Sequence, residues 1–402
     1  MLGIARYFYH FFWAYIGKII FGSPSRDLCV IGVTGTKGKS TTIDMISFVL
    51  ERAGKKTAVV SSVRKKVGDK NIINVTGNTM PGRMYLQQFL KEAVNANAEY
   101  ALIEVTSQGV TQHRHRFIEW SMGVFLNLSP EHIESHGSFD KYRSAKVAFF
   151  SYFAKSKKQK KDFFINAEDK NAGHFYDAVK NIMGGTIHEF QPHNFMAQFG
   201  RELQENTWMS STFNMENASA TYAVCKQIGL SDEEIISALK DLRGVPGRYQ
   251  VIQETPYLVV VDYAHTPDSL KTLYENVRAR IENGKRIICL LGSAGGGRDT
   301  WKRPEMGGIA GQACDYVILT NEDPFDEDPE KILDDVERGV KNSGGLYLRI
   351  LDRREAIQKA IELANPGDAI VATGKGSEKY IRVAGGKRES WDEVEEFQKF
   401  LK

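Results

Sequence analysis

The chain has 402 residues, enough for two or three domains that each bury a hydrophobic core. Its 53 Lys and Arg residues nearly balance its 50 Asp and Glu residues, so the charge indicates no nucleic-acid partner. The cysteines are widely spaced in apolar or helical contexts, which predicts neither a zinc site nor a disulfide framework and favours a reducing compartment. They are Cys29, Cys225, Cys289 and Cys314.

Residues 1–27 are dense in aromatic side chains and predict a single amphipathic helix. The uninterrupted apolar stretch is shorter than the roughly 20 residues that span a bilayer, and no small-residue cleavage site follows it. Three interpretations stay open: a helix docked on the protein body, an interfacial helix that contacts a membrane through residues 1–26, or an oligomer contact. The apolar side would carry Ile4, Phe8, Phe12, Tyr15 and Ile19.

Residues 28–50 predict a strand, a glycine-rich loop and a helix. In this arrangement the loop N–H groups and the helix N-terminus bind anions, Lys39 adds a positive charge, and the Ser40 hydroxyl can reach a metal ion. A nucleoside triphosphate with magnesium fits such a site. The spacing is a variant of the usual P-loop, because Val33 occupies the place of the first glycine. The expected nucleotide-binding residues are Gly35, Thr36, Lys37, Gly38, Lys39, Ser40 and Thr41.

Apolar strands then alternate with helices, which is the pattern of a parallel, doubly wound α/β sheet. We predict strands at 56–62, 100–105 and 122–129, and a helix at 83–93. The sequence therefore predicts a central ATP-binding domain over residues 28–243.

A Gly/Pro-rich stretch at 242–248 marks the predicted domain boundary. Beyond it the alternation restarts, and the apolar strands end in polar or glycine residues. This pattern predicts a second, Rossmann-like α/β domain over residues 244–402. Because ligands of open α/β sheets gather at the carboxyl ends of the strands, we expect part of the binding site there.

Read together, nine motifs resemble those of the Mur ligase family and occur in the same order. The likeness runs from about Leu28 to the C-terminus, and it is greatest to the members that add the third amino acid to UDP-N-acetylmuramoyl-dipeptide. The motifs are TGTKGKSTT (34–42), TGNTMPG (76–82), IEVTSQGVTQHRH (103–115), NLSPEHIESHGSFDKYRSAK (127–146), VPGRYQ (245–250), DYAHTPDSL (262–270), GSAGGGRDTWKRPEMG (292–307), NEDPFDEDP (321–329) and GKGSE (374–378).

The resemblance implies cytoplasmic, ATP-dependent amide formation in cell-wall peptidoglycan biosynthesis. In that chemistry a substrate carboxylate attacks the γ-phosphate to form an acyl phosphate, and an incoming amine then displaces phosphate. The implied cofactors are ATP and Mg²⁺, and the implied substrates are a muramoyl-peptide acceptor and an amino acid. Two alternatives stay open: another superfamily ligase, of the folylpolyglutamate or poly-γ-glutamate type, or a nucleotide-binding, membrane-associated protein that has lost ligation.

The resemblance also implies which residues carry the reaction. Cations should converge on the phosphates, because phosphoryl transfer depends on positioning and charge neutralisation. Ser40, Glu104 and His132 would hold Mg²⁺ together with Lys146, which the family carries as a carbamate. The alternatives are a solvated or snorkelling Lys146 and a structural salt bridge for Arg248. The implied catalytic set is Lys39, Glu104, His132, Lys146 and Arg248.

Further residues match family positions at the nucleotide and the substrates. Asn217 matches the position near the base, although it equally suits a helix cap. Asp262 and His265 match residues at the nucleotide, with a structural hydrogen bond between strand ends as the alternative. The acceptor candidates are Thr79, Pro81, Thr106, Ser107, Gln112 and Arg114, and the amino-acid candidates are Asn321, Asp323, Gly374 and Glu378.

Two departures from the family pattern bear on the substrates. Only about 27 residues precede the ATPase strand, too few for the family's N-terminal UDP-binding α/β domain, so a UDP-linked and a lipid-linked acceptor both stay open. Phe325 stands where enzymes that add meso-diaminopimelate carry the arginine of D-N-P-R. That arginine makes a bidentate pair with the distal carboxylate of the amino acid. An aromatic residue beside acidic residues favours an amino acid with a cationic or smaller side chain, such as lysine.

Overall fold

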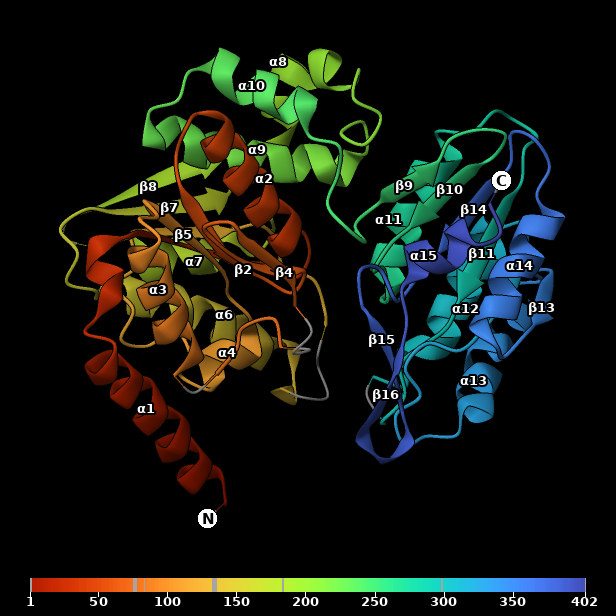
Figure 1. The fold of residues 1–402 in the computed structure, drawn as a ribbon, viewed down its shortest axis with the longest axis horizontal. Helices are drawn as coiled ribbons and strands as arrows, with labels where there is room; N and C mark the ends of the chain where they lie inside the picture. The colour runs from red at the N-terminus through yellow and green to blue at the C-terminus, as the bar shows by residue number, and fades with distance from the viewer. Residues whose placement is uncertain are drawn as a thin grey trace. The chain divides into compact units, whose positions relative to one another are not determined.

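The computed structural model describes residues 2–74, 78–82, 84–131, 136–182, 184–297 and 299–401, with side chains from residue 8 onward. The chain divides between Arg243 and Gly244 into two compact units. Each unit is a twisted sheet flanked by helices (Figure 1). The predicted α/β architecture is therefore confirmed in both halves of the chain.

The sheet of the first unit has the strand order β4-β3-β2-β5-β1-β6-β7-β8 (Figure 1). All neighbours from β2 to β8 pair in parallel, whereas β3 and β4 form an antiparallel hairpin at one edge. The strands are β1 (Cys29–Thr34), β2 (Thr57–Val60), β3 (Arg64–Val67), β4 (Lys70–Ile73), β5 (Tyr100–Glu104), β6 (Met122–Phe125), β7 (Lys161–Asn166) and β8 (Gly185–Phe190).

Helices α3, α6 and α7 cover one face of this sheet, and α2 and α9 pack together on the other (Figure 1). The first face buries an aromatic core in which the Trp120 and Phe149 rings meet edge to face, with their centres 4.9 Å apart. Gly32 of β1 makes room for both rings, because a Cβ there would clash with each of them. The helices are α1 (Leu2–Ile20), η1 (Pro24–Asp27), α2 (Lys39–Arg52), α3 (Tyr85–Asn95), α4 (Ser107–Thr111), α6 (Phe139–Ala154), α7 (Ala172–Val179), α8 (Pro192–Leu203), α9 (Thr212–Ile228) and α10 (Asp232–Asp241).

The second unit has a sheet of order β13-β12-β11-β14-β10-β9, parallel except for the edge strand β9. A separate hairpin, β15–β16, follows it. The strands are β9 (Gln250–Gln253), β10 (Leu258–Val261), β11 (Ile287–Leu291), β12 (Tyr316–Leu319), β13 (Tyr347–Arg349), β14 (Ala369–Ala372), β15 (Tyr380–Val383) and β16 (Lys387–Ser390). The helices are α11 (Pro267–Arg278), α12 (Lys302–Ala313), α13 (Pro329–Asn342), α14 (Arg353–Leu363), η2 (Ala384–Gly386) and α15 (Glu393–Gln398).

The cysteines require a correction. Cys289 and Cys314 form a disulfide with their Cα atoms 6.1 Å apart, although the sequence predicted none. Cys289 lies in β11, and Cys314 follows α12 just before β12, which pairs with β11 in parallel. The βαβ crossover thus brings together two cysteines that are 25 residues apart in the chain. Cys29 and Cys225 are free.

None of the described helices combines the length and the apolar composition that a membrane span requires.

Candidate active site

The glycine-rich loop joins β1 to α2, as the sequence predicted. Gly38 precedes the helix with a φ of 80°, in the left-handed region that favours glycine. A Cβ at this position would also clash with the side-chain oxygen of Asn217. The loop is held from β6 by Asn127, whose Oδ1 accepts hydrogen bonds from the N–H groups of Thr36 (3.2 Å) and Lys37 (2.9 Å).

The first residues of α2 meet the end of β5. Ser40 Oγ donates a hydrogen bond to Glu104 Oε2 at 2.8 Å, and the backbone N–H of Ser62 donates to the same oxygen at 2.8 Å. Lys39 Nζ lies 3.9 Å from Glu104 Oε1 and donates to the Thr36 carbonyl at 2.8 Å. Glu104 is buried. The structure therefore brings Lys39, Ser40 and Glu104 together at the loop.

Lys146 reaches the same loop from α6. Its ammonium donates to the Gly35 carbonyl at 2.7 Å and lies 4.9 Å from the centre of the Tyr142 ring. The residue is buried, so the solvated alternative is wrong. Burial, together with the positive charge of Lys39, lowers the pKa of Lys146 well below its ordinary value. His132, the remaining member of the predicted metal set, lies outside the described residues.

Asn217 approaches the loop from α9. It lies inside the helix, whose N-cap is Ser211, so the helix-cap alternative for Asn217 is wrong. Its Oδ1 accepts a hydrogen bond from Thr42 Oγ1 at 3.2 Å and faces Gly38. Asn217 thus lies directly against the loop that is predicted to hold the nucleotide.

The acceptor candidates lie on two adjoining segments, 78–82 and 106–114. Arg114 joins them, because its guanidinium donates to the Met80 carbonyl and to Gln112 Oε1. Thr106 caps α4 by accepting from Gly109 N at 3.0 Å, and Ser107 Oγ pairs with His136 Nε2 at 3.0 Å. Thr79 and Pro81 flank Met80, whose buried side chain packs against Gly109. The methionine at this position therefore fills space beside α4.

In the second unit, Asp262 organises the turn that carries Arg248. Asp262 accepts backbone hydrogen bonds from Tyr249 and from Ala264, both at 2.6 Å, and burial raises the pKa of Asp262. The Arg248 guanidinium stacks over the Tyr263 ring at 4.4 Å. His265 Nδ1 pairs with the Tyr263 carbonyl at 2.8 Å. The Asp262 contacts match the structural alternative, a hydrogen bond between strand ends, and one of them fixes the backbone at Tyr249, next to Arg248.

The amino-acid candidates surround Lys375. Its ammonium donates to Asp323 Oδ1 and to Glu378 Oε2, each at 2.7 Å. Arg382 adds a backbone hydrogen bond to Asp323 at 2.9 Å and an ion pair at 3.2 Å. Asn321 Oδ1 accepts from the Glu322 N–H at 3.0 Å. Strand ends from β12 and β14 thus gather these polar groups, as expected for an α/β sheet.

Gly374 lies beside Glu322 in the same cluster. Its φ is 94°, and a Cβ there would clash with Glu322 Oε2. Glu322 is buried, and among the residues that the structure describes this oxygen has no hydrogen-bond partner. Burial, helped by the charge of Asp323, raises the pKa of Glu322 to about 7.

Comparison with known proteins identifies the family. The family model "Mur ligase middle domain" matches residues 33–225, and the model "Mur ligase, glutamate ligase domain" matches residues 247–376. The chain belongs to the Mur ligase family. As a Mur ligase it is an ATP-dependent enzyme that forms an amide bond.

Two curated Mur ligases illustrate the relationship. The UDP-N-acetylmuramoyl-L-alanyl-D-glutamate–2,6-diaminopimelate ligase of Geobacillus kaustophilus is 33% identical over 391 residues, covering 91% of this chain and 78% of that protein. The enzyme of the same name from Aquifex aeolicus is 34% identical over 379 residues, covering 91% of this chain and 76% of that protein.

Solved structures agree with this assignment. A structure of a ligase with the same name has 30% identity and a TM-score of 0.59, covering 92% of this chain and 78% of that one. The folylpolyglutamate synthase of Mycobacterium tuberculosis shares the fold, with a TM-score of 0.67 at 14% identity. The match covers 90% of this chain and 92% of that one.

The donor groups of this Mur ligase suit a magnesium ion. Within the described ranges, no three His, Cys, Asp or Glu side chains come together as a metal site. Mg²⁺ does not need such a cage, because it keeps several waters and binds one or two carboxylates together with substrate phosphates. The Ser40 hydroxyl and the Glu104 carboxylate, in direct contact beside the loop, are hard oxygen ligands of this kind. Lys146 as an ammonium offers no lone pair, whereas as a carbamate it would add a second carboxylate.

Several residues that contact the candidate site residues of this Mur ligase were not predicted from the sequence. Asn127 and Ser62 follow β6 and β2, the strands next to β1 and β5, so strand-end polarity was their available signal. Lys375 lies inside the GKGSE motif, where it neutralises two predicted acids. No sequence pattern indicated Arg382, because only the β15–β16 hairpin brings it to Asp323.

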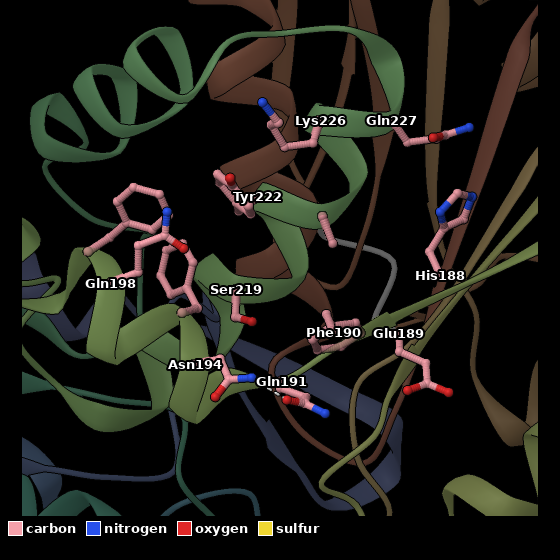
Figure 2. A pocket seen from close by; sticks show the side chains of 13 residues that line it. His188, Glu189, Phe190, Gln191, Asn194, Gln198, Ser219, Tyr222, Lys226 and Gln227 are labelled. Carbon is pink, nitrogen blue, oxygen red and sulfur yellow. Dashed lines mark hydrogen bonds between the residues drawn. The ribbon is translucent and has the colours of Figure 1, made fainter.

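A pocket elsewhere on the first unit contains none of the predicted site residues (Figure 2). It lies between the end of β8, the helix α8 and the side of α9 that carries Ser219 and Tyr222. Its polar groups bind other protein groups: His188 and Gln227 pair with Asp162 at 2.8 and 2.9 Å. The Tyr222 hydroxyl likewise donates to Asp232 at 2.8 Å. We assign this pocket no role in ligation.

Proposed function

We propose that this Mur ligase uses ATP and Mg²⁺ to join an amino acid to the terminal carboxylate of a muramoyl-peptide acceptor. The contact among Lys39, Ser40 and Glu104 at the start of α2 is the observation that carries the proposal. The curated relatives are named as ligases that act on a UDP-N-acetylmuramoyl dipeptide and diaminopimelate.

Each group has a task in the reaction. Loop N–H groups and Lys39 bind the phosphates of ATP, and Arg248 is proposed as a further cation for the phosphate charge. Mg²⁺ at Ser40 and Glu104 would neutralise phosphate charge. An acceptor carboxylate oxygen attacks the γ-phosphorus, the bond to ADP breaks, and an acyl phosphate forms. The amine then attacks the acyl carbon, loses a proton, and expels phosphate that keeps the carboxylate oxygen.

Lys146 is proposed to act as a carbamate. Its lowered pKa increases the fraction of neutral amine, the form that is nucleophilic. The amine nitrogen attacks the carbon of CO₂ and releases a proton, which leaves an anionic group on a long arm beside Gly35. This anion would replace the ammonium that now binds the Gly35 carbonyl, and it would complete the ligand set around Mg²⁺.

A matrix of acceptors against amino acids tests the proposed substrates. The acceptors are a UDP-linked muramoyl dipeptide, a lipid-linked muramoyl peptide and a folate glutamate, and the amines are lysine, ornithine, meso-diaminopimelate and glutamate. Mass spectrometry should show a mass increase of one amino acid on a muramoyl acceptor, with phosphate released only when both substrates are present. A product on the folate acceptor alone, or phosphate release that needs neither substrate, would contradict the proposal.

The choice of amino acid is proposed to favour a cationic side chain. Phe325 supplies no guanidinium, and Arg382, which lies over its ring at 5.5 Å, is already paired with Asp323 and near Glu378. Glu322 instead offers a buried oxygen that accepts no hydrogen bond from any described residue. The charged groups that face Glu322 are Asp323, Lys375, Lys302 and Arg353. A substrate ammonium would provide the donor that Glu322 lacks.

The Glu322→Gln variant tests this preference. Loss of a hydrogen bond to a charged group costs enough to raise the KM for lysine by about tenfold or more. Because the pKa of Glu322 is about 7, the wild-type carboxylate loses its charge as the pH falls below that value, so its KM for lysine should rise. In the variant this component of the pH dependence should disappear. The exposed Glu389 provides the matched control, Glu389→Gln. An unchanged KM in Glu322→Gln would contradict the role of Glu322.

A further inference from the structure

One side of α1 is docked on the first unit. The Phe11 ring lies 5.2 Å from Phe117 and 6.0 Å from His113, and the Tyr15 ring lies 5.3 Å from Phe117. Near the end of the helix, Gly17 permits a close approach to Met84 of the segment before α3. The docked-helix interpretation therefore describes one side of α1. Figure 1 shows the rest of the helix extending away from the unit.

The other side of α1 is apolar and exposed. We call it the outer face, and it consists of Phe8 (64% exposed), Tyr9 (43%), Phe12 (55%), Ile19 (58%) and Ile20 (61%). Tyr15 (44% exposed) lies at the edge of this face, because its ring also contacts Phe117. The spacing of Phe8, Phe12, Tyr15 and Ile19 places them along one side of a helix. In the described part of the chain, the other large exposed hydrophobic side chains are scattered over Ile72, Ile73, Ile187, Trp301 and Leu346. A contiguous patch of this kind marks an interaction surface.

The charge of the segment around α1 favours an anionic partner, although Lys18 lies on the docked side, with its Nζ 5.9 Å from the centre of the Phe117 ring. No acidic residue occurs before Asp27, whereas Arg6, Lys18 and Arg26 are basic. Arg26 is 60% exposed, although it also pairs with Glu119 at 3.0 Å. A second copy of α1 would bring the same positive charges together, whereas anionic lipid headgroups would attract them. Exposed Tyr and Phe rings beside basic residues are typical of helices that lie in the bilayer interface.

We infer that the outer face of α1 binds the surface of an anionic phospholipid bilayer, with the helix lying in the interface rather than crossing it. Of the residues that contact α1, His113 lies between Gln112 and Arg114 in the chain, and Phe117 follows shortly after Arg114. Lipid binding by α1 therefore holds this part of the first unit at the membrane surface.

Vesicle cosedimentation of the full chain tests this inference. The probes are vesicles of phosphatidylcholine alone and vesicles with equal parts of phosphatidylcholine and phosphatidylglycerol. The test variant carries Phe8→Ser, Phe12→Ser and Ile19→Ser, which leave the docked side of α1 intact. The matched control carries Ile72→Ser, Ile187→Ser and Leu346→Ser, which remove three exposed hydrophobic side chains elsewhere.

We expect wild type and control to sediment with the anionic vesicles, and binding to weaken at high salt and on neutral vesicles. The test variant should bind at least about tenfold more weakly, because it loses three apolar side chains from the contact. Equal binding by test variant and control would overturn the inference. A wild-type protein that does not sediment, but forms a dimer that the test variant lacks, would assign the face to self-association instead. Neither measurement depends on ligation, so the result is separate from the proposed function.

Discussion

Replacing Lys146 with alanine is expected to lower the rate of amide formation by about 10³-fold or more, the scale of losing an electrostatic group at a phosphoryl-transfer site. The variant removes a side chain that is buried against the loop and contacts the Gly35 carbonyl. If the active form is a carbamate, a short carboxylate such as formate or acetate should occupy the vacated anionic position and restore part of the rate.

Two controls make this result specific. Lys141→Ala removes an exposed lysine from the same helix and should retain normal turnover. Thermal unfolding of Lys146→Ala should show a folded protein, so that inactivity is not loss of structure. Near-normal turnover in Lys146→Ala would refute the assignment. Inactivity without rescue, together with an electron-density map of the metal-bound state that shows a bare ammonium, would refute the carbamate.

Lys39→Ala and Glu104→Gln should each reduce amide formation by about 10³-fold while leaving the fold intact. Lys39 supplies positive charge at the phosphates. Glu104 contacts Ser40, and its carboxylate is proposed to bind Mg²⁺ together with the Ser40 hydroxyl. Glutamine keeps the size of Glu104 and can still accept from Ser40 and Ser62, so the change isolates the charge.

The two variants should differ in their dependence on magnesium. Glu104→Gln is expected to need more Mg²⁺ for half-maximal rate, whereas Lys39→Ala should weaken ATP binding at saturating Mg²⁺. Glu99→Gln, at the other end of β5 and partly exposed beside Lys55, is the matched control and should behave as wild type. Turnover within a few-fold of wild type in either test variant would contradict the proposed site.

The parallel cores were predictable because their strands are apolar on both faces. The strand predicted at 100–105 and the observed β5 differ by a single residue. The β3–β4 hairpin was missed because Arg64, Lys65, Lys66 and Lys70 give it no apolar signal. The Cys289–Cys314 disulfide was missed because it depends on the pairing of β11 with β12, which the chain spacing does not reveal.

The candidate site was predictable where one motif carries several groups. Lys39 and Ser40 are neighbours in the chain, and Glu104 ends a buried strand that pairs with β1, so their meeting follows from the α/β pattern. The contacts of Asp262 were less accessible, because they depend on the turn at Tyr249 and Ala264. Arg382 reaches Asp323 across 59 residues, a proximity that follows only from the folded hairpin.

Transfer of a labelled oxygen tests the acyl-phosphate account most directly. The acceptor is prepared with ¹⁸O in its reacting carboxylate and incubated with ATP, Mg²⁺ and the preferred amino acid. If the carboxylate attacks the γ-phosphorus and the amine later expels phosphate, each phosphate released should carry one ¹⁸O atom, in equal amount to the amide product and ADP. Unlabelled phosphate formed alongside the amide product, or AMP in place of ADP, would contradict the account.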